Sequence, residues 1–267
     1  MSVTSTQPLI IGHRGSSKAA PENTIAAFTR SLRDGADGIE FDVRLARDGV
    51  PVVIHDALLR RTAQVGGAVS QFTGSELGQV DVGSWFNKKY PNAARREYEK
   101  ETIPSLAQLF TALTNTEALF YLEMKSDTDQ REPLATTVVA LVRQFELAAR
   151  VVVESFDLPV LAILKRIDPG IRVAALFEPG LRRPFSVVKC STMVQLAQRV
   201  GAAEIALHRN LVGPRVIAKA TSCGLASVAW TVDDPKWIAR ARSLGVKALI
   251  TNDPHKMVQA RSCSETV

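Results

Sequence analysis

Short apolar runs alternate with amphipathic stretches along almost the whole chain. The apolar runs resemble buried β-strands, because a strand that is covered on both faces is apolar throughout. We expect strands at Leu9–His13, Ala36–Val43, Leu119–Lys125, Val151–Phe156, Ile171–Leu176, Glu204–His208, Ala226–Val232 and Lys247–Thr251. Amphipathic helices are expected between most of them, at Asn23–Leu32, Ala135–Phe145, Pro159–Arg166, Met193–Val200, Pro214–Thr221 and Pro235–Leu244.

Alternating strands and helices predict a parallel sheet with helices packed outside it. The tally of such units matches a (β/α)8 barrel, so we predict an α/β fold with one domain over residues 1–267. An open, doubly wound sheet is the structural alternative. It is less favoured because no glycine-rich phosphate-binding fingerprint follows the first strand.

Two regions depart from the simple repeat. Asp48-Gly49 lies between two strand-like runs and predicts a β-hairpin with a two-residue turn, which would set Asp42 opposite His55 on one face. The segment Ala57–Glu101 has no clean period, and we expect it to be an insertion that covers the active-site face of the barrel. Helix resumes over Leu106–Leu113, where the preceding serine can cap the first turn.

Charged side chains occur at the ends of several predicted strands. Glu40 and Asp42 share one face of their strand, because side chains alternate along a strand, and Glu123 and Lys125 share a face in the same way. Carboxylates that converge on the carboxyl end of a barrel repel one another unless a cation compensates them. An all-oxygen ligand set favours one divalent ion, Mg²⁺ or Ca²⁺, over zinc.

The neighbouring basic and imidazole groups extend this interpretation. Arg14 and Lys125 suit a phosphate group, because arginine binds phosphate oxygens through two parallel hydrogen bonds. His13 and His55 end two other apolar runs and suit proton transfer near neutral pH. Each feature alone has a structural explanation, such as a surface ion pair or a packed histidine. Their joint placement at strand ends predicts metal-assisted cleavage of a phosphate ester.

Composition excludes several other classes. The chain has 267 residues, 46% hydrophobic and 22% charged, which is typical of a globular protein. The net charge of +6 is dispersed and accompanied by no nucleic-acid-binding module, so we expect no nucleic-acid partner. Three cysteines without metal-like spacing fit a reducing compartment. No signal peptide or membrane span is evident, so we expect a cytoplasmic protein without stable membrane insertion, of undefined oligomeric state.

With these residues the chain resembles the glycerophosphodiester phosphodiesterase family. The first half carries the most specific motifs, and they occur in the family's order to the end of the chain. The matching segments are His13-Arg14-Gly15, Pro21-Glu22-Asn23-Thr24, Gly35-Ala36-Asp37, Ile39-Glu40-Phe41-Asp42-Val43, Asp48-Gly49, Val52-Val53-Ile54-His55-Asp56, Ile103-Pro104-Ser105-Leu106, Leu122-Glu123-Met124-Lys125, Ser155-Phe156-Asp157, Trp230-Thr231-Val232 and Thr251-Asn252-Asp253-Pro254.

The resemblance implies a TIM barrel with a small insertion after the second strand. It implies residue roles as follows: a divalent metal on Glu40, Asp42 and Glu123; general acid–base catalysis by His13 and His55; phosphate binding by Arg14 and Lys125; and Trp230 as a wall for the glycerol moiety. The implied reaction hydrolyses a small-molecule glycerophosphodiester to sn-glycerol 3-phosphate and an alcohol. The glycerol 2-hydroxyl attacks phosphorus, and water opens the resulting cyclic phosphate.

Two residues depart from the family pattern. Asp233 stands where asparagine is common, and Asn252 stands where aspartate is common. We expect both to affect the substrate pocket more than the metal site. Glu22 is expected either to accept a hydrogen bond within the site or to serve only as a helix N-terminal acid.

Other activities compete with this interpretation. A lysophospholipase D or phospholipase C-like activity on lipid phosphodiesters would need an exposed apolar rim, to which Trp85-Phe86 could contribute. A catalytically silent binding protein would be expected to lack one of the histidines, and both are present. A glycosidase using Glu40 and Glu123 would leave both histidines and the basic pair without roles.

Overall fold

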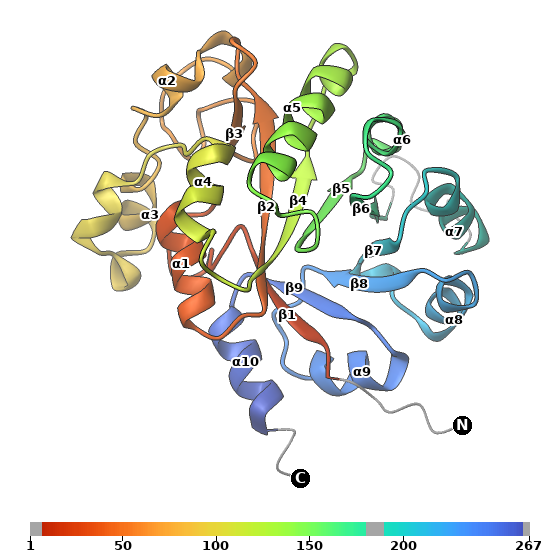
Figure 1. Cartoon of the computed structure of the whole chain (residues 1–267). Coiled ribbons are helices and arrows are strands. Elements are labelled where there is room, and N and C mark those ends of the chain that lie inside the picture. The colour runs from red at the N-terminus through yellow and green to blue at the C-terminus, as the bar shows by residue number, and fades with distance from the viewer. Residues whose placement is uncertain (1–6, 180–189, 264–267) are drawn as a thin grey trace.

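A closed ring of parallel strands forms the centre of the molecule (Figure 1). The structure is a computed structural model that describes residues 7–179 and 190–263. The barrel strands are β1 (Leu9–His13), β2 (Gly38–Leu45), β4 (Leu119–Met124), β5 (Val151–Ser155), β6 (Arg172–Phe177), β7 (Glu204–His208), β8 (Ala226–Trp230) and β9 (Ala248–Thr251). β1 pairs with both β9 and β2, which closes the ring. The predicted (β/α)8 barrel is therefore confirmed, and the open sheet is excluded.

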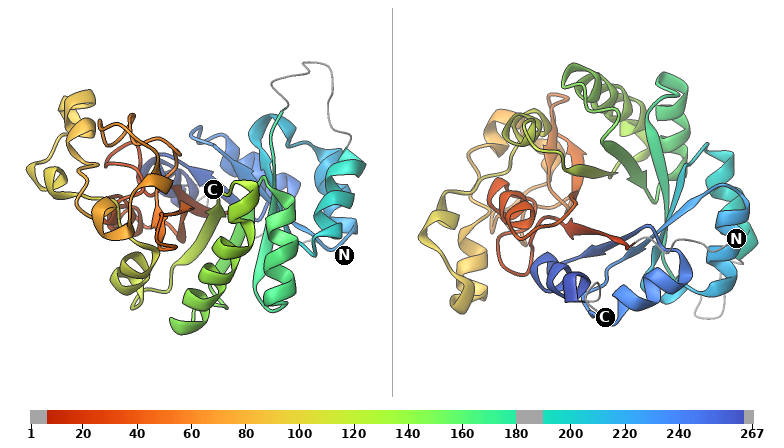
Figure 2. Two further views of the ribbon diagram at one scale, coloured as in Figure 1. Left: turned by 90° about the horizontal axis from the view of Figure 1, so that it is seen from above. Right: turned by 60° about the horizontal axis from the view of Figure 1, so that its bottom comes forward.

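Helices surround the barrel, as the view along its axis shows (Figure 2, right). They are α1 (Ile25–Arg33), α4 (Leu106–Leu113), α5 (Arg131–Gln144), α6 (Leu158–Ile167), α7 (Cys190–Arg199), α8 (Pro214–Ser222), α9 (Trp237–Leu244) and α10 (Pro254–Cys263). Hydroxyl side chains cap two of these helices, and the cap at Ser105 is the one that the sequence predicted. Thr24 accepts from the backbone N–H of Ala27, and Ser105 accepts from that of Gln108.

Strand alternation separates an apolar outer layer from a polar inner end. On β2, Ile39, Phe41 and Val43 are fully buried in the apolar layer between the strands and the helices. The residues between them, Glu40 and Asp42, therefore project into the barrel. The sequence pattern thus positions acidic groups inside the ring without disturbing its outer packing.

The predicted hairpin forms, but its register differs by one residue from the expected one. β3 (Pro51–Val53) runs antiparallel to β2 with Val43 opposite Val53, so Ile54, and not His55, hydrogen-bonds Asp42 through the backbone. The expectation that Asp42 faces His55 in register is wrong. The loop contains one residue more than expected, since Ala46 N–H bonds to Val50 C=O, and Gly49 takes the left-handed conformation with φ 79°.

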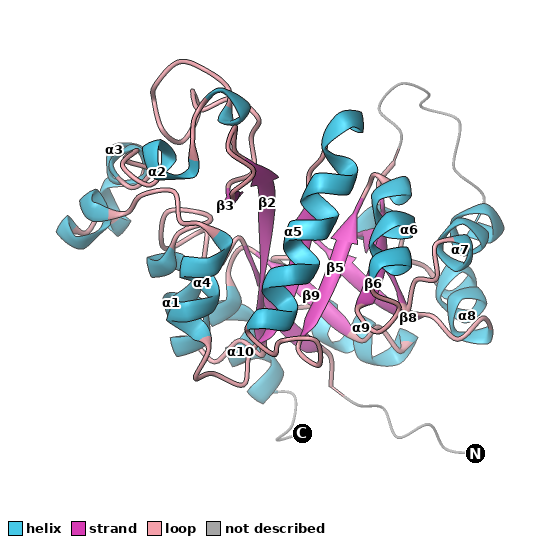
Figure 3. Ribbon diagram, turned by 45° about the horizontal axis from the view of Figure 1, so that its top comes forward, coloured by secondary structure: helices cyan, strands magenta, loops and turns pink. Residues whose placement is uncertain are grey.

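Residues 57–101 lie outside the barrel beside α1 and α4 (Figure 3). They include α2 (Gly74–Leu77), α3 (Ser84–Lys89) and the 3₁₀ turns Val69–Gln71, Pro91–Ala93 and Arg96–Lys100. Trp85 and Phe86 are 8% and 0% exposed and pack against Ala20 and Ala27. The sequence-based suggestion that they form an exposed apolar rim is therefore wrong. That the insertion covers the active-site face stays a prediction.

The helices of the described ranges are too short or too polar to cross a bilayer.

Candidate active site

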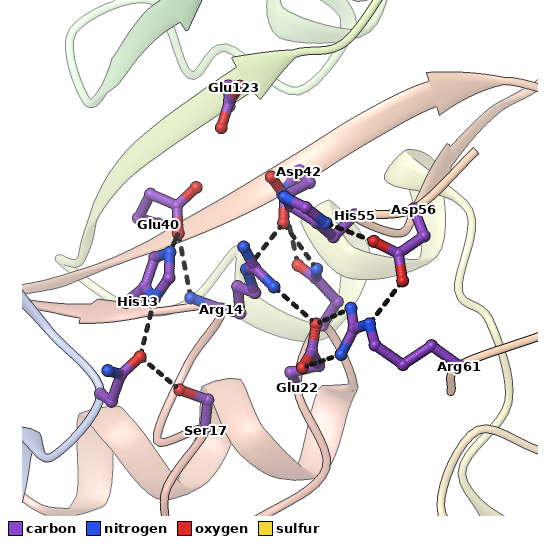
Figure 4. A network of polar contacts seen from close by, with 12 residues as sticks. His13, Arg14, Ser17, Glu22, Glu40, Asp42, His55, Asp56, Arg61 and Glu123 are labelled. Carbon is purple, nitrogen blue, oxygen red and sulfur yellow. Dashed lines mark hydrogen bonds and ion pairs between the residues drawn. The ribbon is translucent and has the colours of Figure 1, made fainter. Parts of the chain in front are cut away.

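Three carboxylates from two neighbouring strands converge inside the barrel (Figure 4). Glu40 and Asp42 come from β2 and Glu123 from β4, with Asp42 and Glu123 in register. Each offers an oxygen within 4.8 Å of the other two, and their exposed fractions are 2%, 1% and 8%. This is the acidic cluster that the sequence predicted.

Two cations hold Asp42 between them. The Lys125 Nζ lies 2.7 Å from Glu123 Oε1 and 3.2 Å from Asp42 Oδ1, and Arg14 Nε lies 3.2 Å from Asp42 Oδ2. Asn23 Nδ2 also donates to Asp42 Oδ2 at 2.8 Å. Burial alone would raise the pKa of Asp42, but Lys125 and Arg14 hold it well below its usual range. Asp42 is therefore ionised.

The other two carboxylates are compensated less completely, although Lys125 also pairs with Glu123. Burial and the charge of Asp42 raise the pKa of Glu40 well above its usual range and that of Glu123 to about 7. A divalent cation would relieve this crowding, and three carboxylates match the oxygen ligands that Mg²⁺ and Ca²⁺ take. The acidic cluster therefore fits a divalent metal.

The loop after β1 positions Arg14 through a left-handed backbone. Arg14 has φ 54° and Gly15 has φ 80°, and a Cβ on Gly15 would come within 2.5 Å of the Ala27 carbonyl carbon. The turn directs the Arg14 backbone N–H to Glu40 Oε2 at 3.0 Å while its side chain reaches Asp42. A strained backbone at this point indicates a functional constraint.

His13 ends β1 beside Glu40. Its Nδ1 donates to Asn252 Oδ1 at 2.7 Å, and its Nε2 lies 3.8 Å from Glu40 Oε2. Asn252 Nδ2 donates in turn to Asp233 Oδ2 at 2.8 Å. Burial, reinforced by the charge of Arg14, lowers the pKa of His13 to about 4. The imidazole is therefore neutral, with Nε2 on the side of the acidic cluster.

His55 follows β3 and has a different partner. Its Nδ1 donates directly to the Asp56 carboxylate at 2.6 Å, and Arg44 Nε binds its backbone oxygen at 2.7 Å. Burial lowers the pKa of His55, while the charge of Asp42 opposes that shift. Figure 4 shows this ring beside Asp42.

An ion-pair network joins His55 to the phosphate-binding candidates. Arg61 binds both Asp56 and Glu22, with Nη1 and Nη2 at 2.7 and 2.8 Å from the two Glu22 oxygens. Glu22 also accepts from Arg14 Nη1 at 2.8 Å. Of the two alternatives for Glu22, the structure supports the hydrogen bond within the site.

A cavity of about 440 Å³ opens over these groups. It is lined by seven of the eight predicted site residues, with Asp42 buried behind them, and by an aromatic and aliphatic wall. The seven are His13, Arg14, Glu40, His55, Glu123, Lys125 and Trp230. The wall includes Phe156, whose ring packs edge-to-face on Trp230 with centroids 5.5 Å apart.

Sequence reasoning missed the residues that support the histidines. Asn252 accepts a hydrogen bond from His13 and donates one to Asp233. We expected these two departures from the family pattern to affect mainly the substrate pocket, whereas they also support the His13 imidazole. Asp56 could have been suspected from its position next to His55. Glu154 is a further buried carboxyl on a barrel strand, and the rule that singled out Glu40 would also have found it.

Comparisons with known proteins agree with this geometry. The model of the glycerophosphoryl diester phosphodiesterase family matches residues 13–256. A glycerophosphodiester phosphodiesterase of Caldanaerobacter subterraneus subsp. tengcongensis is 32% identical over 251 residues, covering 94% of this chain and 96% of the relative. One of Bacillus altitudinis is 30% identical over 257 residues, covering 94% and 97%.

A solved structure gives the same result for the fold. The Oleispira antarctica phosphodiesterase, in complex with the product sn-glycerol-3-phosphate, superposes with a TM-score of 0.82 at 26% identity, covering 96% of this chain and 97% of that one.

Proposed function

Since this chain belongs to the glycerophosphoryl diester phosphodiesterase family and is a glycerophosphodiester phosphodiesterase, we propose that it forms sn-glycerol 3-phosphate and an alcohol by metal-dependent histidine acid–base catalysis. The observation that carries the proposal is the acidic cluster of Glu40, Asp42 and Glu123 with an imidazole beside it on each of two elements. The product bound in the Oleispira antarctica enzyme supports the glycerol phosphate end of the substrate.

Glu40, Asp42 and Glu123 would hold one divalent ion, Mg²⁺ or Ca²⁺. When bound, this ion would stabilise negative charge on the phosphoryl oxygens and orient the substrate. The cluster's excess of carboxylates over adjacent cations supports this role.

Arg14 and Lys125 would bind the phosphate. Both line the cavity, and both stay charged because Asp42 raises the pKa of each against the opposing effect of burial. Glu22 fixes the Arg14 guanidinium from behind, which pre-orients it for phosphate oxygens.

The two histidines would act as a pair in the first step. His13 donates Nδ1–H to Asn252, so its Nε2 has a free lone pair and can accept the proton of the glycerol 2-hydroxyl. That oxygen forms a bond to phosphorus as the bond to the leaving alcohol breaks. His55 can protonate the leaving oxygen, because the Asp56 carboxylate stabilises its imidazolium form. With roles reversed, water opens the cyclic phosphate.

The test is an assay with glycerophosphocholine, bis(p-nitrophenyl) phosphate and lysophosphatidylcholine, each with and without EDTA. We expect glycerophosphocholine to give sn-glycerol 3-phosphate and choline, and we expect EDTA to abolish turnover until Mg²⁺ or Ca²⁺ is restored. Faster cleavage of lysophosphatidylcholine would instead assign a lipid phosphodiesterase. Full activity after exhaustive metal removal would refute the metal dependence.

A further inference from the structure

Glu154 is a buried carboxyl without a part in the proposed chemistry. It lies on β5, in register with Glu123 on β4, and is 2% exposed. It lines the same cavity as Trp230. It is not among the three residues whose oxygens lie within 4.8 Å of one another. The acidic cluster therefore does not account for it.

Two buried polar atoms of this cavity have no partner among the described residues. They are Glu154 Oε2 and Trp230 Nε1. A third atom without a hydrogen bond, Arg14 Nε, is within ion-pair distance of Asp42 at 3.2 Å. Buried polar atoms in native proteins are nearly always paired, so an unpaired acceptor and an unpaired donor in one cavity call for an explanation.

Among the described residues, the polar groups one layer deeper in the barrel do not bond to Glu154 Oε2. Tyr121 lies one layer deeper on β4, and its hydroxyl donates to Glu204 Oε2 at 2.9 Å. The Lys247 ammonium pairs with Glu204 Oε1 at 2.5 Å. These deeper groups bind one another and leave Glu154 Oε2 without a bond. A ligand in the cavity that Glu154 lines can supply that bond.

We propose that the Glu154 carboxyl and the Trp230 indole N–H bind the terminal hydroxyl of the substrate's glycerol moiety. This inference rests on the proposed function and deepens it. It makes Glu154 a specificity residue that selects free glycerophosphodiesters over lysophospholipids. An acyl ester at the terminal oxygen removes the hydrogen that Glu154 would accept and adds a chain beside Phe156 and Leu176.

A hydroxyl matches this pair of atoms because it donates and accepts at one oxygen. It can donate to a carboxylate or accept from a carboxylic acid, so the pairing does not depend on the titration of Glu154. An ammonium group would satisfy the carboxyl but would not accept from the indole N–H. A site that is built to hydrogen-bond a hydroxyl discriminates strongly against the analogue that lacks it.

The test compares two ligands that differ only at this hydroxyl. They are sn-glycerol 3-phosphate and propane-1,2-diol 1-phosphate, titrated calorimetrically into the protein with Mg²⁺ and separately with Ca²⁺. We expect the wild type to bind the diol phosphate about 10–100-fold more weakly, as the loss of hydrogen bonds to one hydroxyl implies. In Glu154→Leu we expect the ratio of the two affinities to fall to within about twofold.

Three further variants make the comparison specific. Glu154→Gln keeps an acceptor oxygen and should retain most of the ratio. Trp230→Phe keeps a ring but removes the N–H, and should lower the ratio several-fold, so the proposal stays testable if Glu154→Leu does not fold. Glu178→Gln changes an exposed carboxyl that lines the same cavity, and it should retain the wild-type ratio.

Two outcomes would overturn the inference. One is a wild-type ratio near one, or a ratio that Glu154→Leu leaves unchanged. The other is an equal loss for both ligands together with weaker Mg²⁺ binding, which would make Glu154 a metal ligand. Failure of the proposed function would appear separately, as a wild-type protein that does not hydrolyse glycerophosphocholine.

Discussion

The two histidines of the site are held in different ways. His13 is part of a barrel strand and donates to the neutral amide of Asn252, whose own amide group is bound by Asp233. His55 follows the short hairpin strand and donates directly to the carboxylate of Asp56. A negative charge next to an imidazole stabilises its protonated form, and an intervening amide weakens that effect. Two identical side chains can therefore take opposite roles in proton transfer.

The strongest test of this comparison removes each imidazole in turn. His13→Ala and His55→Ala should each lower kcat for glycerophosphocholine about 10²–10⁴-fold, the usual contribution of a general acid or base. Both variants should keep the wild-type melting temperature and metal affinity, measured by calorimetry. A near wild-type rate in either variant would remove that histidine from the mechanism.

The acidic cluster would act together with both histidines. Variants that lack one of its carboxylates should therefore not separate the roles of His13 and His55. Glu40→Ala and Asp42→Ala should weaken metal binding by more than the roughly 10–100-fold that loss of an outer hydrogen-bonding partner costs. Titration calorimetry with Mg²⁺ and Ca²⁺ measures the effect. Glu132→Gln is the control, because that carboxyl is exposed and pairs with Arg166. Unchanged affinity in Asp42→Ala would exclude Asp42 from the ligand set.

Asp56→Asn should separate the two histidines. Without the adjacent negative charge the pKa of His55 falls further below its usual value, so less of it is protonated at neutral pH. If His55 is the acid of the first step, the alkaline limb of kcat/KM moves to lower pH, and turnover falls by about 10–100-fold. Movement of the acidic limb instead would reverse the assignment.

Exchanging the side chains of Asn252 and Asp233, which lie behind His13, should have the smallest effect on turnover. In the double variant Asn252→Asp and Asp233→Asn, the net charge is unchanged, but the carboxylate now contacts His13 directly. We expect the pKa of His13 to rise from about 4, so that the acidic limb of kcat/KM moves to higher pH while the rate at its plateau changes by less than about tenfold. An unmoved acidic limb would mean that His13 is not the base.

The barrel and the acidic cluster could be predicted because they depend on local patterns. Strict alternation on β2 separates Ile39 and Phe41 from Glu40, and register with β4 then brings Glu123 to Asp42. The hairpin shows the limit of this reasoning, since Asp48-Gly49 signals a turn but does not fix the loop length. One additional loop residue changed the register of the whole strand.

Asp56 is next to His55 in the sequence, but the other supporting contacts could not be predicted, because they join distant parts of the chain. His13 and Asn252 are 239 positions apart and meet only because β9 returns to pair with β1. Arg61 and Glu22 come from the insertion and from the loop before α1. No local pattern marks such pairs. Glu154 is different, since its place in a buried strand was visible in the sequence.

Glu22 is shared by Arg14 of the barrel loop and Arg61 of the insertion. It therefore links the barrel to the inserted segment 57–101 through an ion pair with each. Loop exchange at Gly66-Gly67 leaves these ion pairs in place, whereas replacement of Glu22 removes the carboxylate that both arginines share. A change of the insertion at Arg61 can therefore reach Arg14 of the barrel loop through a single shared carboxylate.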